Sequence, residues 1–146
     1  MSQARVYVSF DIDHDRELYE QLLAQARGSG FCVSGESEFV SPDGIWTERA
    51  RCRIREADEV IVICGEHSEA SQAMSAEIRI AQEEKTPYFL LWGRRGAMCK
   101  KPIGAKSAEG MYSWTREILE DQVAIALRRA RALSPAEPAW DRARSA

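Results

Sequence analysis

An uninterrupted apolar run from Val60 to Cys64 (VIVIC) constrains the fold of this chain more than any other feature. A strand that faces solvent on one side alternates apolar and polar residues, whereas this run has no polar position. A continuous run of strand length is typical of a strand buried on both faces, as in a parallel sheet covered by helices. The sequence therefore predicts a central strand here, inside a layered α/β domain.

The segment after this strand predicts a helix with an acidic residue on its apolar side. Gly65 ends the strand, and Ser71 is a suitable helix N-cap after a short polar loop. A helical wheel at about 100° per residue shows two apolar sets. One set is Met74, Ile78 and Ala81, the other is Ala73 and Ile80, and Glu77 falls between them. Burying an unpaired carboxylate costs several kcal/mol. Glu77 is therefore expected to be paired, to lie at a pocket rim, or to take part in chemistry.

The remaining segments alternate between strand and helix patterns. Strands are expected at 5–10, 31–33 and 87–92, and helices over the stripe 18–26, at 45–57 and at 114–133. The connections are long enough for crossovers, which predicts a flavodoxin-like three-layer sandwich with a central parallel sheet. Ligands bind such sheets at the carboxyl ends of the strands, so the loops there are expected to form the functional edge. We expect one domain over residues 1–133 and a flexible tail over residues 134–146.

Composition and charge argue against several classes of partner. With 146 residues and 45% hydrophobic content, the chain can form one domain with a sizeable core. Its net charge of −3 argues against nucleic acid as the main partner, because that binding needs a concentrated basic face. No apolar run is long enough to span a membrane, and the N-terminus lacks the apolar core of a signal peptide. The four cysteines lack metal-ligand spacing, so we expect a reduced, cytoplasmic protein without a bound metal.

Several activities that are common in this architecture lack their residues. The first loop carries Asp11, Asp13 and Asp15, which would repel the FMN phosphate that a flavodoxin binds. A phospho-receiver needs an aspartate at the end of the third strand, where this chain has Cys64 and Gly65. Neither GxGxxG nor GxxxxGK[ST] occurs, so dinucleotide-binding and P-loop modes lack support.

Three stretches, in order along the chain, carry a family resemblance. They are the run from Val6 to Asp11, the stretch from Ile54 to Cys64, and the spaced pattern Gly65, Ser68, Ser71, Met74, Glu77, Ile78 and Ala81. Together with Lys101-Pro102 and Tyr112-Ser113-Trp114, they resemble bacterial TIR-like domains, in particular the TIR-like NAD-handling subunit of Thoeris antiphage systems. The likeness covers about residues 4–130.

The resemblance implies an enzyme that cleaves the nicotinamide–ribose bond of NAD, with Glu77 at the position of the family's catalytic glutamate. NAD is then the substrate rather than a cofactor, and the product is a linear or cyclic ADP-ribose-derived signal in antiphage defence. Breaking an N-glycosidic bond develops oxocarbenium charge, which a carboxylate can stabilise or trap. The resemblance matches five residues to the substrate pocket: Ser9, Phe10, Asp11, Trp46 and Ser71. Of these, Trp46 could provide a surface on which a base stacks.

One departure from the family pattern bears on catalysis. The family commonly has an aromatic residue four positions before the glutamate, and this chain has Ala73 there. Two alternatives therefore stay open. One is a non-catalytic TIR-like module that docks onto another protein. The other is an enzyme similar to nucleoside deoxyribosyltransferases, which also direct a glutamate at an N-glycosidic bond.

The loop from Ser34 to Trp46 is more apolar than a solvated loop requires, because it contains Phe39, Val40 and Ile45. In the family, a neighbouring copy packs head to tail against this loop, which is a heterologous contact that generates filaments or rings. We therefore expect self-association, or an activating partner protein, to accompany NAD turnover. The alternative is that these side chains fold back onto the core.

Overall fold

The computed structural model describes residues 3–41 and 44–133, with side chains described up to residue 129. The strands are β1 (Ala4–Ser9), β2 (Phe31–Glu36), β3 (Glu59–Cys64), β4 (Tyr88–Trp92) and β5 (Met111–Tyr112). The helices are α1 (Arg16–Ala26), α2 (Ile45–Glu56), α3 (Gln72–Glu84) and α4 (Arg116–Leu133), with a 3₁₀ turn at Ser68–Ala70. The tail expected over residues 134–146 lies outside the described residues.

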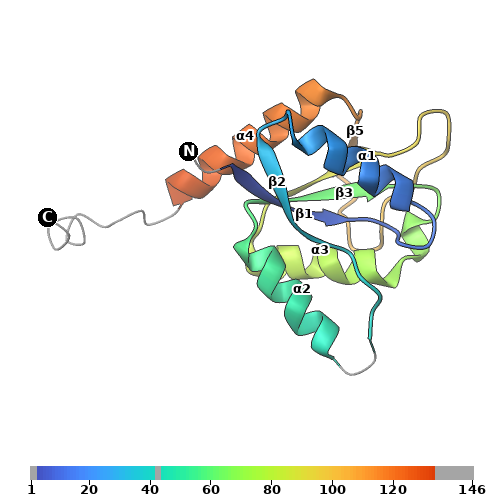
Figure 1. The fold of residues 1–146 in the computed structure, drawn as a ribbon. Coiled ribbons are helices and arrows are strands. Elements are labelled where there is room, and N and C mark those ends of the chain that lie inside the picture. The colour runs from blue at the N-terminus through green and yellow to red at the C-terminus, as the bar shows by residue number, and fades with distance from the viewer. Residues whose placement is uncertain (1–2, 42–43, 134–146) are drawn as a thin grey trace, which may run out of the picture.

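The strands form one parallel sheet in the order β2-β1-β3-β4-β5. This is the strand order of flavodoxin-like doubly wound sheets. Helices α1 and α4 cover one face of the sheet, and α2 and α3 cover the other (Figure 1). The expected three-layer α/β sandwich is therefore confirmed.

Strand β3 is buried along its whole length, as its apolar run predicts. Its side chains alternate between the two faces: Ile61 and Ile63 pack with α1 and α4, whereas Val60 and Val62 pack with α2 and α3. Each such side chain contributes about 1.5–3 kcal/mol relative to an exposed position. The two core layers are thus joined through one central strand.

Strand β2 is longer than the sequence indicates and is irregular. The predicted strand ended at Val33, but pairing with β1 continues to Glu36. Val6 pairs with Val33 and Tyr7 pairs with Gly35, so one extra residue, Ser34, lies between the two pairs. The residues after Val33 are polar, so the sequence gives no strand pattern for this extension. The extension forms because its backbone pairs with β1, not because its side chains are buried.

Two smaller differences concern the end of the domain. The two-residue strand β5 has no apolar pattern of its own and was not predicted. Helix α4 begins at Arg116 rather than at Trp114, because the hydroxyl of Thr115 accepts a hydrogen bond from the Ile118 N–H at 3.1 Å and caps the helix.

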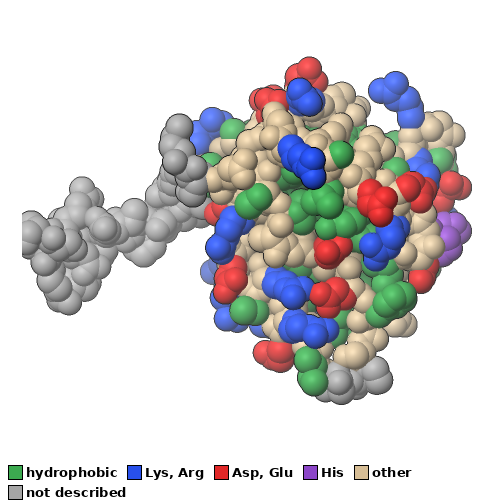
Figure 2. All heavy atoms as spheres, viewed as in Figure 1, with side chains coloured by type: hydrophobic (Ala, Val, Ile, Leu, Met, Phe, Trp, Pro, Cys, Tyr) green, Lys and Arg blue, Asp and Glu red, His purple; other side chains and the backbone are tan. Residues whose placement is uncertain are grey.

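Acidic and basic side chains are interspersed on the face of the molecule seen in Figure 2, with hydrophobic side chains scattered among them. Among the helices within the described residues, none is both long enough and apolar enough to cross a membrane.

Candidate functional site

Glu77 lies in the middle of α3 and faces the sheet. Ser71 caps the helix as expected, accepting a hydrogen bond from the Met74 N–H at 3.2 Å. Helix periodicity then turns Glu77 inward together with Met74 and Ile78, and all three side chains are 0% exposed. The expectation that this carboxyl group lies within apolar surface is confirmed.

Three hydroxyl groups donate hydrogen bonds to the Glu77 carboxyl. The Tyr7 hydroxyl lies 2.6 Å from Oε2, and the hydroxyls of Ser9 and Ser37 each lie 2.7 Å from Oε1. Tyr7 and Ser9 come from β1, whereas Ser37 follows the last residue of β2. The site therefore joins α3 to the carboxyl ends of two neighbouring strands, which is the edge expected to be functional.

Strand alternation explains why β1 supplies two of these donors. Tyr7 and Ser9 are two residues apart, so both side chains point to the same face of the sheet, toward α3. The Tyr7 ring fits because Gly35 lies opposite it, where a Cβ atom would be 2.7 Å from the ring. The extra residue in β2 brings this glycine into register with Tyr7.

Ser37 is held in place by β1 as well as by Glu77. Its N–H donates to the Val8 carbonyl at 3.0 Å, and its hydroxyl accepts from the Phe10 N–H at 3.0 Å. The same hydroxyl donates its one proton to Glu77, so it has no further hydrogen bond to donate. The segment after β2 thus covers the carboxyl group.

Burial raises the pKa of Glu77 to about 7, and the hydrogen bonds from Tyr7, Ser9 and Ser37 oppose that rise because they stabilise the ionised form. Burial and the nearby Glu77 raise the pKa of Tyr7, so this hydroxyl remains a donor. Near neutral pH the carboxyl therefore occurs in both protonation states. A group of this kind can exchange a proton or stabilise a developing positive charge.

The other residues of the predicted first-loop site lie away from Glu77. Phe10 is 0% exposed and stacks on Tyr19, with ring centroids 4.8 Å apart, on the side of the sheet that α1 covers. Asp11 accepts a hydrogen bond from the Asp13 N–H and lies 3.0 Å from Nδ1 of His14. The structure therefore unites Ser9 with Glu77, whereas the Phe10 ring packs in the core beneath α1 and Asp11 organises the turn that leads to α1.

Trp46 lies in the first turn of α2, the helix expected to begin at residue 45. Its side chain is 3% exposed and belongs to the core cluster that α2 and α3 share with the sheet. In this conformation it offers no open face to a base, so stacking would require α2 to move. Ala73, at the position where the family commonly has an aromatic residue, is also buried in this cluster.

Two members of the site, Tyr7 and Ser37, were not predicted. Tyr7 had a usable signal, because it shares its strand face with Ser9. Ser37 had none, because it lies beyond the point where the apolar pattern of β2 ends.

Comparison with known proteins bears on the fold. No family model and no curated protein matches this chain. Among solved structures, the TIR domain of the Toll-related receptor TRR-2 from Hydra magnipapillata is 15% identical, with 85% of this chain and 94% of that chain covered and a TM-score of 0.55. A prokaryotic SEFIR domain is 19% identical over 86% of this chain and 90% of that one, with a TM-score of 0.49.

A CMP N-glycosidase of Clostridium botulinum also matches, at 26% identity over 60% of this chain and 70% of that chain, with a TM-score of 0.46. Of these three matches, the receptor domain has a TM-score above 0.5. Because its sequence identity to this chain is low, the likeness indicates a shared fold and nothing more. Its fold, together with the strand order and layers described above, leads to one conclusion. This chain has a TIR-like fold.

Proposed function

We propose that this protein is a TIR-type NAD glycohydrolase or cyclase in which Glu77 acts on the nicotinamide–ribose bond. The observation that carries the proposal is the buried Glu77 carboxyl with its three hydroxyl donors, at the carboxyl edge of a parallel sheet. The TIR-like fold and the sequence resemblance support the same activity.

The proposed chemistry uses the ionised carboxylate. As nicotinamide leaves C1′ of the ribose with the bonding electron pair, positive charge develops on C1′ and the ring oxygen, and the carboxylate stabilises or traps it. Water then adds to C1′ and gives up a proton, or a nucleophile within ADP-ribose closes a ring. Few water molecules screen a carboxylate in such surroundings, so its charge acts strongly.

Access to Glu77 requires a change in the loop after β2. The carboxyl is 0% exposed, and Ser37 is part of its cover. Phe39 and Val40 follow shortly after Ser37 and are 74% and 46% exposed, so they do not fold back onto the core. We propose that a neighbouring copy, or an activating partner, binds these side chains and draws Ser37 away from Glu77. The isolated domain would then be weakly active, and assembly would open the site.

The test is incubation of the purified chain with NAD over a range of protein concentrations, with released nicotinamide measured by chromatography. Glu77→Gln should lower turnover at least about hundredfold, as expected for a group that acts directly in the reaction. Circular dichroism should stay close to that of the parent protein, and the variant should not melt at a lower temperature at neutral pH. Glu83→Gln is the matched control, because Glu83 lies on the same helix with a 51% exposed side chain.

Retained turnover in Glu77→Gln, or loss of the fold, would instead assign the carboxyl a structural role. A parallel incubation with deoxynucleosides tests for a deoxyribosyltransferase-like reaction. Mass spectrometry of the products distinguishes linear from cyclic ADP-ribose, and the proposed setting of this signal is antiphage defence in the cytoplasm.

A second candidate is a non-catalytic TIR-like interaction module. The burial of Glu77 and of Trp46 favours it, since this conformation presents neither group to a ligand. In that case the exposed loop side chains would bind another protein without opening a site. Absence of NAD consumption at every protein concentration, together with self-association through the loop, would support this second reading.

A further inference from the structure

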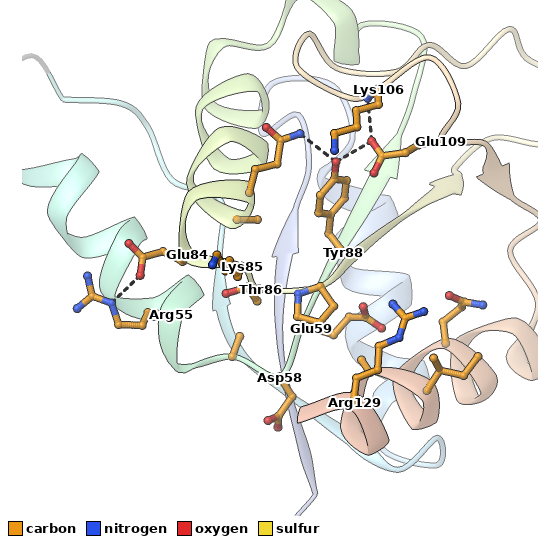
Figure 3. A pocket seen from close by; sticks show the side chains of 17 residues that line it. Arg55, Asp58, Glu59, Glu84, Lys85, Thr86, Tyr88, Lys106, Glu109 and Arg129 are labelled. Carbon is orange, nitrogen blue, oxygen red and sulfur yellow. Dashed lines mark hydrogen bonds and ion pairs between the residues drawn. The ribbon is translucent and has the colours of Figure 1, made fainter. Parts of the chain in front are cut away.

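A cavity of about 600 Å³ opens at the edge of the sheet opposite Glu77 (Figure 3). It lies where β3 and β4 begin, between the end of α3 and the side of α4. Part of its wall is apolar, formed by Ala57, Ala81, Pro87, Ile125 and Ala126. A concave site with an apolar wall and a few convergent polar groups is the usual form of a small-molecule site.

Glu59 is a buried polar group at this cavity with an unused hydrogen-bond acceptor. Its side chain is 3% exposed, and its Oε1 is fully buried with no hydrogen-bond partner among the described residues. Figure 3 shows Glu59 and Arg129 pointing toward one another, and the two form no ion pair in the described part of the chain. A buried oxygen left without a donor costs about 1–3 kcal/mol.

Three other polar groups of the cavity are already engaged. Arg55 binds Glu84 at 2.9 Å, and the Tyr88 hydroxyl donates to Glu109 at 2.6 Å. The Thr86 hydroxyl donates to the Ile54 carbonyl at 3.1 Å. These contacts leave Glu59 as the buried group that a ligand could satisfy.

The protonation state of Glu59 narrows the chemistry of that ligand. Burial raises the pKa of Glu59 to about 8, with the positive charge of Arg129 opposing the rise, so the group is a neutral carboxylic acid at neutral pH. A carboxylic acid offers one O–H donor and one accepting oxygen. Its complement is an amide edge, which offers an N–H beside a C=O. An ammonium ligand fits less well, because it would require ionised Glu59 and would approach Arg129.

We propose that this cavity binds a small ring compound bearing a primary carboxamide or a lactam. A turn of the Glu59 side chain toward the cavity brings Oε1 within reach, so that the amide N–H of the ligand donates to it, the ligand carbonyl accepts from the O–H of the same carboxyl, and the ring packs on the apolar wall. This site is separate from the proposed NAD site, since Glu59 begins β3 whereas Glu77 lies at the carboxyl edge. The proposal therefore holds or fails independently of NAD turnover.

The test uses benzamide as the probe and acetophenone as its matched partner, which is also neutral and has the same ring and carbonyl but no N–H. Titration of the ¹⁵N-labelled full chain should shift the backbone amide signals of Ala57, Ile125 and Ala126 with benzamide. Acetophenone should bind about tenfold more weakly, since it lacks the hydrogen bond donor. Equal binding of the two compounds, or benzamide shifts confined to the residues around Glu77, would overturn the proposal.

Variants of Glu59 give a second readout. Glu59→Leu should weaken benzamide binding at least about tenfold, whereas Glu59→Gln should keep it, because a carboxamide side chain still offers one donor and one acceptor. Glu83→Gln is the control, since the Glu83 side chain is 51% exposed and Glu83 is not among the residues that line the cavity. Unchanged affinity in Glu59→Leu would contradict the assignment, and loss of affinity in Glu59→Gln would do so as well.

Discussion

The Ser37 hydroxyl lies 2.7 Å from Oε1 of Glu77, although 40 residues separate the two in the sequence. The same hydroxyl accepts the Phe10 N–H, so one serine connects the end of β1, the segment after β2 and the buried acid of α3. Withdrawing Ser37 would remove a donor that stabilises the ionised carboxylate and would uncover the group at the same time. The position of the loop after β2 and the chemical state of Glu77 are therefore linked.

The first prediction concerns the pH dependence of folding stability. The pKa of Glu77 is raised from 4.5 to about 7 in the folded protein, so the folded state holds a proton there that the unfolded chain releases. The stability from this proton is fully present below about pH 4.5 and is lost as the pH rises through 7; it amounts to about 3 kcal/mol. Glu77→Gln has no such titration. The unfolding free energy of the variant minus that of the parent protein should therefore rise by about the same amount between about pH 5 and 8. Urea unfolding at a series of pH values measures this difference.

Comparing the two proteins isolates this effect. Glu59 also has a raised pKa and contributes a parallel loss of stability with rising pH, which is the same in the parent protein and in Glu77→Gln. The difference between their unfolding free energies is therefore the quantity to follow. A difference that stays constant across this pH range would show that folding does not raise the pKa of Glu77.

The second prediction concerns Gly35, which makes room for Tyr7. A Cβ atom at this position would lie 2.7 Å from the Tyr7 ring and 3.3 Å from the Cβ of Arg53. Gly35→Ala should therefore lower the free energy of unfolding by about 1–3 kcal/mol, because the ring that binds Glu77 must shift. Gly110→Ala is the matched control, since it meets no atom within 4 Å, and denaturant unfolding compares the two. Equal stability of both variants would mean that Tyr7 moves without cost.

The sequence predicted those parts of the fold in which a single strand or helix has a distinct hydrophobic pattern. The apolar run of β3 predicted a strand buried on both faces, and the spacing of Met74 and Ile78 predicted the inward direction of Glu77. Both signals are local, because they depend on the period of one strand or one helix. The TIR-like fold follows from several such elements in the right order.

The partners of Glu77 were harder to predict, because they depend on contacts between distant segments. Ser37 reaches the site through pairing of β2 with β1 across an irregular register, which no local pattern reveals. The helix that begins at Ile45 was expected, but the inward direction of Trp46 was not, because it depends on how α2 packs against α3 and the sheet. The side of the helix that packs on its neighbours thus decides between a binding surface and a buried side chain.

The third prediction tests this placement of Trp46. The side chain is 3% exposed between α2, α3 and the sheet, so its removal leaves a cavity. Trp46→Ala should lower the free energy of unfolding by about 3–5 kcal/mol, whereas a solvent-exposed stacking surface would change it little. Guanidinium unfolding followed by circular dichroism makes the measurement. A loss below about 1 kcal/mol would show that Trp46 is not a core residue in solution.

The fourth prediction concerns assembly through the loop after β2. Phe39 is 74% exposed, so Phe39→Asp should leave the folded domain intact while removing apolar contact area from any interface that uses this loop. We expect turnover of NAD per molecule to rise with concentration in the parent protein and to stay low and flat in Phe39→Asp. Sedimentation velocity should show the same difference in self-association.

Ile103→Asp provides the comparison, because Ile103 is also well exposed, at 64%, and lies in the loop between β4 and β5. This variant should associate and turn over NAD as the parent does, since its charge lies outside the segment that covers Glu77. If activity in the parent protein is flat over a hundredfold dilution series, or if both variants behave alike, the loop does not couple assembly to the site. Glu77 would then need another route to its substrate, with the segment from Ser37 onward remaining closed over it.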